Sequence, residues 1–479
     1  MAFYQDLRDW LEQVDKMGEL KRVNGADWSL EIGAIADTVT KNPRNTWALL
    51  FDEIKGYPAG YRVLTGILNS PRRLALTVGF ESKFGDREFV MAWRERLRTL
   101  RPVPPKVVTK GPVLENFHTK DEVNLLEFPA PQWHELDGGR YIGTGSATIT
   151  RDPDDGSINI GTYRVMIHDK NKVAFFISPG KDGRIHRDKH LSRGKPCPVA
   201  IVVGEDPLLF LASILPLTHA KDGFKDEYEW IGGIRGKPFE VIEGKVTKLP
   251  IPAQAEIVLE GFAYPGDEKI EGPFGEWTGY YASQQRPEPF IKVEAIYHRN
   301  NPIICGAVVS RMPSDFTHAY ELVRSAQLWN ELEAAGVPGI QGVTCYQHRF
   351  ITVVSIKQQY PGHAKQTAML AMQCHAGAYL GRYVIVVDDD IDIYEFNQVL
   401  WAVATRVDPI KDIEVAQNCW SGPLDPIIPP GEKGLASRAM IDATKPYKWL
   451  AQFPPSIIIK PELKAQVKEK WSGLDLFEL

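Results

Sequence analysis

The fold is constrained most by a change of pattern near residue 114, where helical spacing of apolar residues gives way to short β-branched runs. These runs are separated by glycine-containing turns and continue to about residue 310. The clearest of them lie at residues 145–150, 163–168, 172–177, 198–203 and 255–259. Short strands at this spacing are typical of a β-barrel or sandwich, so we predict such a core with inserted helices.

Before this segment, helices and strands alternate. Apolar residues recur at helical spacing over residues 4–17, which predicts an amphipathic helix. The other expected elements are a helix at 30–40 with Ser29 as its N-cap, a strand at 47–51 and a helix at 70–79. We assign residues 1–110 to a small α/β domain, followed by a proline-rich linker at 101–112.

After the β-rich segment, apolar residues at three-and-four spacing predict a long helix within 313–336. Strands and helices then alternate: strand 352–356, helix 364–374, strand 383–387 and helix 394–407. This alternation predicts a C-terminal α/β domain at 337–450 with a tail at 451–479 that could pack on a neighbouring subunit. The expected fold class is therefore α/β (α+β).

Composition narrows the functional class. The chain has 479 residues, 43% hydrophobic and 24% charged, with a net charge of −5. These are the values of an ordinary globular protein of about three domains, and they give no basic footprint for nucleic acid. No run of 18 apolar residues occurs, and the N-terminus lacks the apolar core of a signal peptide. Five widely spaced cysteines fit reduced thiols, so we expect a cytoplasmic protein.

Two short segments carry most of the chemistry. Residues 159–164 (NIGTYR) place Asn159 and Arg164 beside a glycine, and residues 271–281 (EGPFGEWTGYY) hold Glu271 and Glu276. A planar guanidinium can bind a carboxylate bidentately, and a neighbouring Glu can stay neutral and donate a proton. Such a set suits a substrate that is itself an acid. On spacing alone, a surface salt-bridge cluster is the alternative interpretation.

The same segments identify a family. The chain resembles the UbiD family of decarboxylases, which use prenylated FMN. The resemblance is carried by Asn-x4-Arg at Asn159, Glu-x4-Glu at Glu271, DEYEWIGGIRGKP at 226–238, QYPGHAKQ at 359–366, VIVVDDDIDIYEFNQVLWAVATRVDP at 384–409 and IDATKPY at 441–447. It covers nearly the whole chain. It implies a split β-barrel of the FMN-binding type at 111–312, a linking helix at 313–336 and a C-terminal α/β oligomerisation domain.

The resemblance also implies cofactor and metal sites. Prenylated FMN would lie against residues 160–163 (Ile160, Gly161, Thr162 and Tyr163), near Ser213, with Arg382 at its phosphate. Asn159 and Glu227 match the family's ligands for a divalent metal such as Mn²⁺, which joins the phosphate; K⁺ is expected as well. The third ligand falls in the 181–190 loop. We choose His186, with Asp182 as the alternative and His190 as a third candidate. Ser213 could equally be a serine in an apolar strand, and Arg382 a surface arginine.

The implied activity is reversible, non-oxidative decarboxylation of an aromatic, heteroaromatic or α,β-unsaturated acid. Arg164 would hold the substrate carboxylate, Glu276 would protonate the carbon after CO₂ leaves, and Glu271 would orient Arg164. The alternatives are a carboxylase or coenzyme A-thioester decarboxylase subunit of a complex, and a flavin-binding protein without turnover.

Further expectations follow from the same resemblance. A flavin prenyltransferase would supply the cofactor, and the protein would form a homo-oligomer, either a dimer or a hexamer. Tyr320, Leu322 and the 423–430 loop are candidates for contact with the substrate. The acidic run at 388–390 is expected to be structural, and His363 and His375 are expected to be packing residues on helices.

Overall fold

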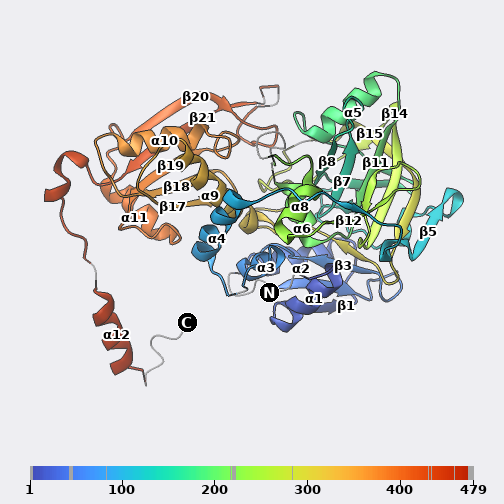
Figure 1. The fold of residues 1–479 in the computed structure, drawn as a ribbon, viewed down its shortest axis with the longest axis horizontal. Coiled ribbons are helices and arrows are strands. Elements are labelled where there is room, and N and C mark those ends of the chain that lie inside the picture. Colours follow the sequence, from blue (N-terminus) through green and yellow to red (C-terminus); the bar gives the residue numbers. More distant parts are fainter. Residues whose placement is uncertain are drawn as a thin grey trace.

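The computed structural model has two lobes with two helices between them (Figure 1). It describes residues 4–42, 47–81, 83–215, 217, 223–282, 284–429, 431–432, 434–457 and 459–472. One lobe is a curled sheet with the N-terminal region below it, and the other is the C-terminal α/β domain. Helices α4 (Asp86–Thr99) and α9 (Thr317–Ala334) pack on each other between the lobes. The mixed fold predicted from the sequence is confirmed.

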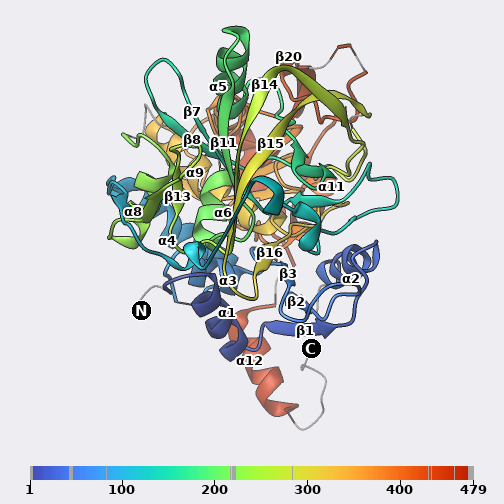
Figure 2. The ribbon, with the colours of Figure 1, turned by 90° about the vertical axis from the view of Figure 1, so that its right-hand side faces the viewer.

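The larger lobe is built on one nine-stranded sheet that is antiparallel at every pairing between its described strands. Its order is β6-β9-β10-β15-β14-β11-β7-β8, and β5 pairs with β15. The strands are β5 (Asn116–Thr119), β6 (Tyr141–Gly143), β7 (Ala147–Arg151), β8 (Ile158–Gly161), β9 (Val165–Asp169), β10 (Lys172–Ala174), β11 (Cys197–Val202), β14 (Ile257–Glu271) and β15 (Arg286–His298). Figure 2 shows β14 and β15 crossing this half-barrel, with α5 at one end. All five predicted β-branched runs fall on these strands.

Among the described residues, three helices are inserted into the half-barrel: α5 (Asp182–Ser192), α6 (Pro207–Ile214) and α8 (Glu227–Arg235). The apolar run of α6 suggested a strand at Ser213, and that interpretation was wrong. The helix begins because Pro207 stands in its first turn and the Asp206 carboxylate accepts the amide of Leu208 at 2.8 Å. A helix that is apolar all round is buried, which hides the helical period that would have identified it.

The N-terminal region forms a four-stranded sheet in the order β1-β2-β3-β16. Its elements are α1 (Leu7–Lys16), β1 (Leu20–Asn24), α2 (Glu31–Thr40), β2 (Ala48–Asp52), β3 (Arg62–Thr65), α3 (Pro71–Thr77) and the returning strand β16 (Ile303–Cys305). Helix α1 buries the apolar face that the sequence predicted. Ser29 is not the cap of α2, because Leu30 takes that position with a φ of 70° and no side-chain cap bond.

The proline-rich segment at 101–112 is not a free linker. Its strand β4 (Lys106–Val107) pairs with β12 (Glu240–Glu243), which also pairs with β13 (Pro250–Pro252). The short 3₁₀ helices in the part of the chain that the structure describes are η1 (Pro112–Leu114), η2 (Lys120–Glu122), η3 (Leu125–Glu127) and η4 (Tyr447–Gln452). The segment therefore ties the N-terminal region to the half-barrel through backbone hydrogen bonds.

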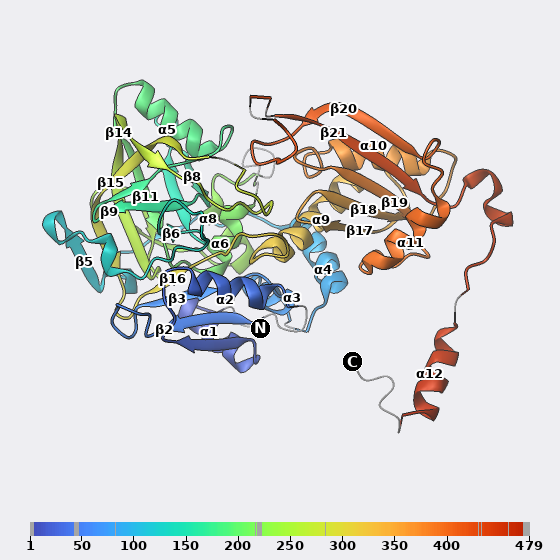
Figure 3. The ribbon, with the colours of Figure 1, turned by 180° about the vertical axis from the view of Figure 1, so that it is seen from behind.

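The C-terminal domain is a five-stranded mixed sheet in the order β17-β18-β19-β21-β20. Its elements are β17 (Ile340–Tyr346), β18 (Ile351–Ile356), α10 (His363–Gln373), β19 (Tyr383–Asp388), α11 (Phe396–Arg406), β20 (Ile413–Trp420) and β21 (Leu435–Ala443). The sequence predicted β18, α10, β19 and α11 but not the other three strands. Beyond the sheet, α12 (Pro461–Lys470) stands away from the body of the protein (Figures 1 and 3). No helix among the described residues is both long and apolar enough to span a bilayer.

Candidate active site

The structure brings Arg164, Glu271 and Glu276 together. The Nε and Nη2 atoms of Arg164 donate to the two carboxylate oxygens of Glu271, each at 2.8 Å, while Nη1 donates to Glu276. All three are buried, and Glu271 has no exposed surface. The guanidinium also lies over the ring of Phe176, with 4.2 Å between its Cζ and the ring centroid. The predicted cluster is therefore one hydrogen-bonded unit and not a surface salt-bridge network.

Local structure explains why these residues meet. Arg164 lies between β8 and β9, and Glu271 is the last residue of β14. Glu276 follows in the loop that joins β14 to β15. The loop can turn tightly because Gly272 adopts a φ of +81°, which favours glycine. Behind the cluster, the Tyr141 hydroxyl donates to Glu271 at 3.2 Å.

The electrostatics of the cluster are uneven. Desolvation lowers the pKa of Arg164, but the carboxylates of Glu276 and Glu271 outweigh it and the net shift is upward. Burial raises the pKa of Glu276, and the neighbouring Glu271 raises it further, against the opposing effect of Arg164. One cation cannot fully compensate two buried carboxylates. Glu276 is therefore the carboxyl of the pair that is disposed to hold a proton.

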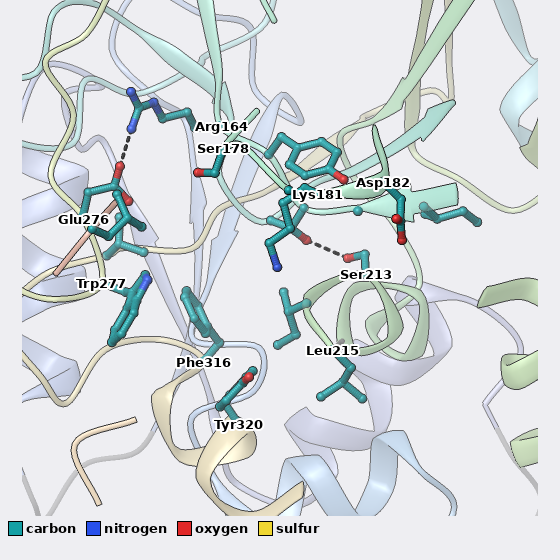
Figure 4. Close-up of a pocket in the computed structure, with 18 of the residues that line it drawn as sticks. Arg164, Ser178, Lys181, Asp182, Ser213, Leu215, Glu276, Trp277, Phe316 and Tyr320 are labelled. Carbon is teal, nitrogen blue, oxygen red and sulfur yellow. Dashed lines mark hydrogen bonds and ion pairs between the residues drawn. The ribbon is translucent and has the colours of Figure 1, made fainter. Parts of the chain in front are cut away.

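Arg164 and Glu276 open onto a cavity of about 470 Å³ between the two lobes, and Glu271 stands behind them. Its lining combines residues of β8, α5, α6 and α8 with residues of α9 and the C-terminal domain. Figure 4 shows Arg164 and Glu276 at one side, Asp182 and Ser213 at the other, Lys181 between them, and Trp277, Phe316 and Tyr320 opposite. The volume lies in the usual range for a small-molecule or cofactor site.

The far end of the cavity is polar. Asn159, Asp182 and Glu227 all line it. The Asn159 amide nitrogen donates to the Tyr163 hydroxyl at 3.3 Å, and Glu227 accepts the Ile160 amide at 2.9 Å. An amide and two carboxylates supply hard oxygen donors, which are the ligands that Mg²⁺ and Mn²⁺ prefer.

His186 lies on α5 with both ring nitrogens turned to other partners. Its Nδ1 is 3.0 Å from the Thr150 hydroxyl, and its Nε2 is 3.6 Å from Asp152. The side chain does not line this cavity, whereas Asp182, the alternative ligand, does. His190 points elsewhere too, with its Nε2 3.2 Å from the carbonyl of Arg151.

Three domain matches span most of the chain. They are the N-terminal domain of 3-octaprenyl-4-hydroxybenzoate carboxy-lyase (UbiD) over residues 11–92, its Rift-related domain over 106–312 and its C-terminal domain over 317–443. The phenolic acid decarboxylase of Sedimentibacter hydroxybenzoicus is 33% identical over 92% of both chains. The chain belongs to the UbiD family. It is accordingly a carboxy-lyase, as the sequence predicted.

Other UbiD relatives agree with this placement. The pyrrole-2-carboxylic acid decarboxylase of Pseudomonas aeruginosa is 31% identical over 98% of this chain and 97% of its own. The closed form of the vanillic acid decarboxylase from S. hydroxybenzoicus superposes with a TM-score of 0.84 at 31% identity, covering 98% and 99% of the two chains. The UbiD-class enzyme HmfF from Pelotomaculum thermopropionicum, in complex with FMN, gives 0.83 at 29% identity over 96% and 98%. An evolved dimeric form of that enzyme was solved with prFMN.

The remaining predicted residues of this UbiD-family chain divide into two groups. Ile160, Gly161, Thr162, Tyr163 and Ser213 line the cavity. The Thr162 amide donates to the Ser213 carbonyl at 3.0 Å, and the two hydroxyls are 2.6 Å apart. Arg382 lies outside the lining, since its Nη2 donates to both oxygens of Asp425 at 2.7 Å.

The predicted substrate contacts divide in the same way. Tyr320 and Leu424 of the 423–430 loop line the cavity, while Leu322 is buried in the core. Pro430 lies outside the described residues. His375, predicted as a packing residue, lines the cavity. Asp390 and Asp388 bind Arg406, which agrees with a structural role for the acidic run.

Sequence reasoning missed two cations of the cavity, Lys181 and Arg349. Enclosure in the cavity lowers the pKa of Lys181, and the neighbouring Arg349 lowers it further. Arg349 lies over the rings of Tyr320 and Tyr379, with Cζ 4.5 and 5.3 Å from their centroids. From the sequence, Arg349 would be placed in a solvent-exposed turn between two strands. It lines the cavity only because the C-terminal domain docks against the half-barrel.

Proposed function

We propose that this protein removes the carboxyl group of an aromatic or heteroaromatic acid while prenylated FMN is bound in the cavity between its lobes. The proposal rests on one observation: a buried guanidinium held between two carboxylates opens onto that cavity. The named activities of the relatives support the substrate class.

The lining residues fit a flavin nucleotide. Gly161 lines the cavity without a side chain, and the ring of Tyr163 packs against it, since an added Cβ would lie 2.5 Å from the Tyr163 hydroxyl oxygen. Lys181 and Arg349 would offset the charge of a phosphate. When bound, the cofactor would supply an electron sink, which protein side chains lack. The FMN and prFMN complexes of the UbiD-class enzyme HmfF support this assignment.

Asn159, Asp182 and Glu227 are the residues we propose for the divalent metal. The Asn159 amide nitrogen is engaged by Tyr163, so its oxygen is the atom suited to face a cation. We prefer Asp182 to His186 as the third ligand, because Asp182 lines the cavity with the other two, whereas His186 lines a neighbouring pocket together with Asn159 and Asp182. The expected K⁺ site stays a prediction.

The reaction assigns a separate task to each residue of the cluster. Arg164 would hold the substrate carboxylate on its Nη1 side, beside Glu276, which accepts from the same nitrogen, because Glu271 occupies the Nε and Nη2 edge. When the bond to the carboxyl carbon breaks and CO₂ leaves, Glu276 would deliver its proton to the ring carbon. Glu271 would act as a positioning residue. Trp277 and Tyr320 both stack on the ring of His348, with 4.2 Å and 4.0 Å between the ring centroids, respectively. This aromatic side of the cavity suits a flat aromatic substrate.

The test is production of the full chain together with a flavin prenyltransferase, followed by an absorbance spectrum. The loaded protein is then screened for CO₂ release from benzoic, furoic, pyrrole-carboxylic and acrylic acids. Turnover of a free ring acid by this chain alone is the expected result. Turnover that needs a second protein or a coenzyme A thioester would favour a subunit of a complex. A flavin-loaded protein that neither releases CO₂ nor exchanges ring protons would overturn the proposal.

A further inference from the structure

A second cluster of metal-ligating side chains lies on the outer side of the half-barrel. It consists of His118 on β5, Glu127 on η3 and His298 at the end of β15. One ligand atom from each residue lies within 4.8 Å of the other two, and the Nε2 atoms of the two histidines are 3.1 Å apart. Figures 1 and 3 both place β5 at the edge farthest from the C-terminal domain, so the cluster is separate from the cavity.

Strand register explains the convergence of the two histidines. In the β5–β15 pairing, His118 is opposite Ile296 and His298 is opposite Asn116. His118 and His298 are therefore diagonal neighbours on the same face of the ladder. Their rings are stacked, with centroids 5.1 Å apart and planes inclined by 9°. The chain then turns through η2 and returns at η3, which brings Glu127 to the same place.

The hydrogen bonds of His298 leave one nitrogen for a ligand. Its Nδ1 is 2.9 Å from the carbonyl of Arg299, which can only accept, so Nδ1 carries the proton. In the neutral ring, Nε2 then presents a lone pair toward His118. A second-shell bond to a backbone carbonyl is how proteins commonly orient a metal-binding histidine.

Glu127 gives independent support. Its Oε1 atom is inaccessible to solvent and has no hydrogen-bond partner among the described residues. A buried carboxylate oxygen without a partner is destabilising, and a cation at this point would compensate it.

We propose that His118, Glu127 and His298 form a Zn²⁺ site that holds the segment from β5 to η3 against β15. Two imidazoles and one carboxylate are a known zinc ligand set, with water completing the coordination. Tetrahedral ligands at about 2.0 Å from the metal lie about 3.3 Å from one another, close to the observed separation of the two nitrogens. His118 and Glu127 are partly exposed, which gives an ion a path of entry.

The experiment measures Zn²⁺ bound to the full-length chain by equilibrium dialysis and elemental analysis, with the melting temperature recorded with and without Zn²⁺. The Glu227→Gln background removes the candidate metal site of the cavity. In that background we expect one bound Zn²⁺ and a higher melting temperature with the ion. Glu127→Gln or His118→Gln should weaken Zn²⁺ binding at least about 100-fold, beyond the effect of losing a second-shell partner.

Glu122→Gln is the matched control, since it makes the same charge change on an exposed residue five positions earlier. It should leave Zn²⁺ binding unchanged. Co²⁺ serves as a spectroscopic probe, because tetrahedral binding gives visible absorption that the Glu127→Gln variant should lack. The proposal is overturned if the Glu227→Gln protein binds no Zn²⁺, or if Glu127→Gln and Glu122→Gln bind it equally well. The two histidines then form only a hydrogen-bonded pair.

Discussion

Arg164 and Arg406 are two of the arginines that lie between two carboxylates, and of this pair only Arg164 faces the cavity. Arg164 lies between Glu271 and Glu276 in the half-barrel lobe. Arg406 lies between Asp388, at 3.2 Å, and Asp390, with two bonds of 2.9 Å, in the C-terminal domain. Both guanidiniums are buried, and each is bound bidentately by one of its two acids.

The two clusters differ in charge balance. Asp390 also binds the ammonium of Lys445 at 2.7 Å, so two cations face two carboxylates there. Burial would raise the pKa of Asp390, but Arg406 and Lys445 outweigh it and hold the pKa below its usual range. In the other cluster Arg164 is the cation that binds both buried carboxylates; Arg286 also acts to lower the pKa of Glu276, but burial and Glu271 outweigh the two arginines and the pKa is raised. Asp388 of the Arg406 cluster also has a pKa raised by burial, but it lies outside the cavity, which suits a structural role. Glu276 faces the cavity and is therefore the acid placed for proton transfer.

The largest expected effect is the loss of turnover in Glu276→Gln. Glutamine keeps the shape but cannot donate the proton, so kcat should fall by about 10²–10⁴-fold. The matched change Asp390→Asn should leave kcat unchanged and lower the melting temperature. Steady-state CO₂ release and thermal melting of both variants check this. Equal loss of kcat in both variants would contradict the distinction between the clusters.

Arg164→Lys is the next strongest test. Lysine keeps the charge but lacks the planar fork, so the substrate carboxylate loses its orientation and kcat/KM should fall about 100-fold. The flavin spectrum should be retained. Arg406→Lys should instead cost about 2 kcal/mol of stability, with kcat/KM unchanged. If kcat/KM of Arg164→Lys stays within threefold of the parent value, Arg164 does not orient the substrate carboxylate as proposed.

The raised pKa of Glu276 predicts a pH dependence. The acid works in its protonated form, so kcat/KM should fall as pH rises through this pKa, by up to tenfold per pH unit. Glu276→Asp should move this alkaline limb. The pKa of Asp388 is also raised by burial, but Asp388 lies outside the cavity, so Asp388→Asn should leave the limb in place. A pH profile of kcat/KM for the three proteins measures it, and an unmoved limb in Glu276→Asp would argue for another acid.

Much of this contrast could be predicted from the sequence, because local patterns set most strands and helices. The β-branched runs predicted a barrel or sandwich, while the split barrel came from the family resemblance. The spacing of Glu271 and Glu276 around a turn fitted a surface salt-bridge cluster as well as a pair of functional acids. Their meeting with Arg164, a hundred residues away, came from family resemblance. Composition alone cannot predict the strand register that places the end of β14, with Glu271, beside Arg164.

What the sequence could not show depends on tertiary docking. His186 and Asp182 are four residues apart on α5 and so lie on one face, one turn apart. Which of them reaches the cavity depends on where the helix begins beside it, and Asp182, its first residue, is the one that lines the cavity. Arg349 enters the cavity because the C-terminal domain docks against the half-barrel. Arg382 was placed at the phosphate by resemblance, but in this chain Asp425 holds it. In each case the position of the side chain depends on contacts with residues that are distant in the sequence.

The smallest expected effect comes from Lys445→Met, which gives the Arg406 cluster the charge balance of the Arg164 cluster. Because Lys445 and Asp390 are partly exposed, the loss of stability at pH 7 should be about 0.5–1 kcal/mol. The pKa of Asp390 is held low in the folded state, so this stabilisation is present above the usual Asp pKa and is lost as pH falls below about 4. The difference in melting temperature between parent and variant should therefore be constant from pH 8 to 6 and shrink toward pH 4.

Lys411→Met, which removes an exposed partner of Asp408 at 2.6 Å, is the control and should change the melting temperature less. A larger change in the control would show that Lys445 contributes nothing beyond an ordinary surface ion pair, and that the charge balance of the Arg406 cluster does not distinguish it from the cluster at the cavity.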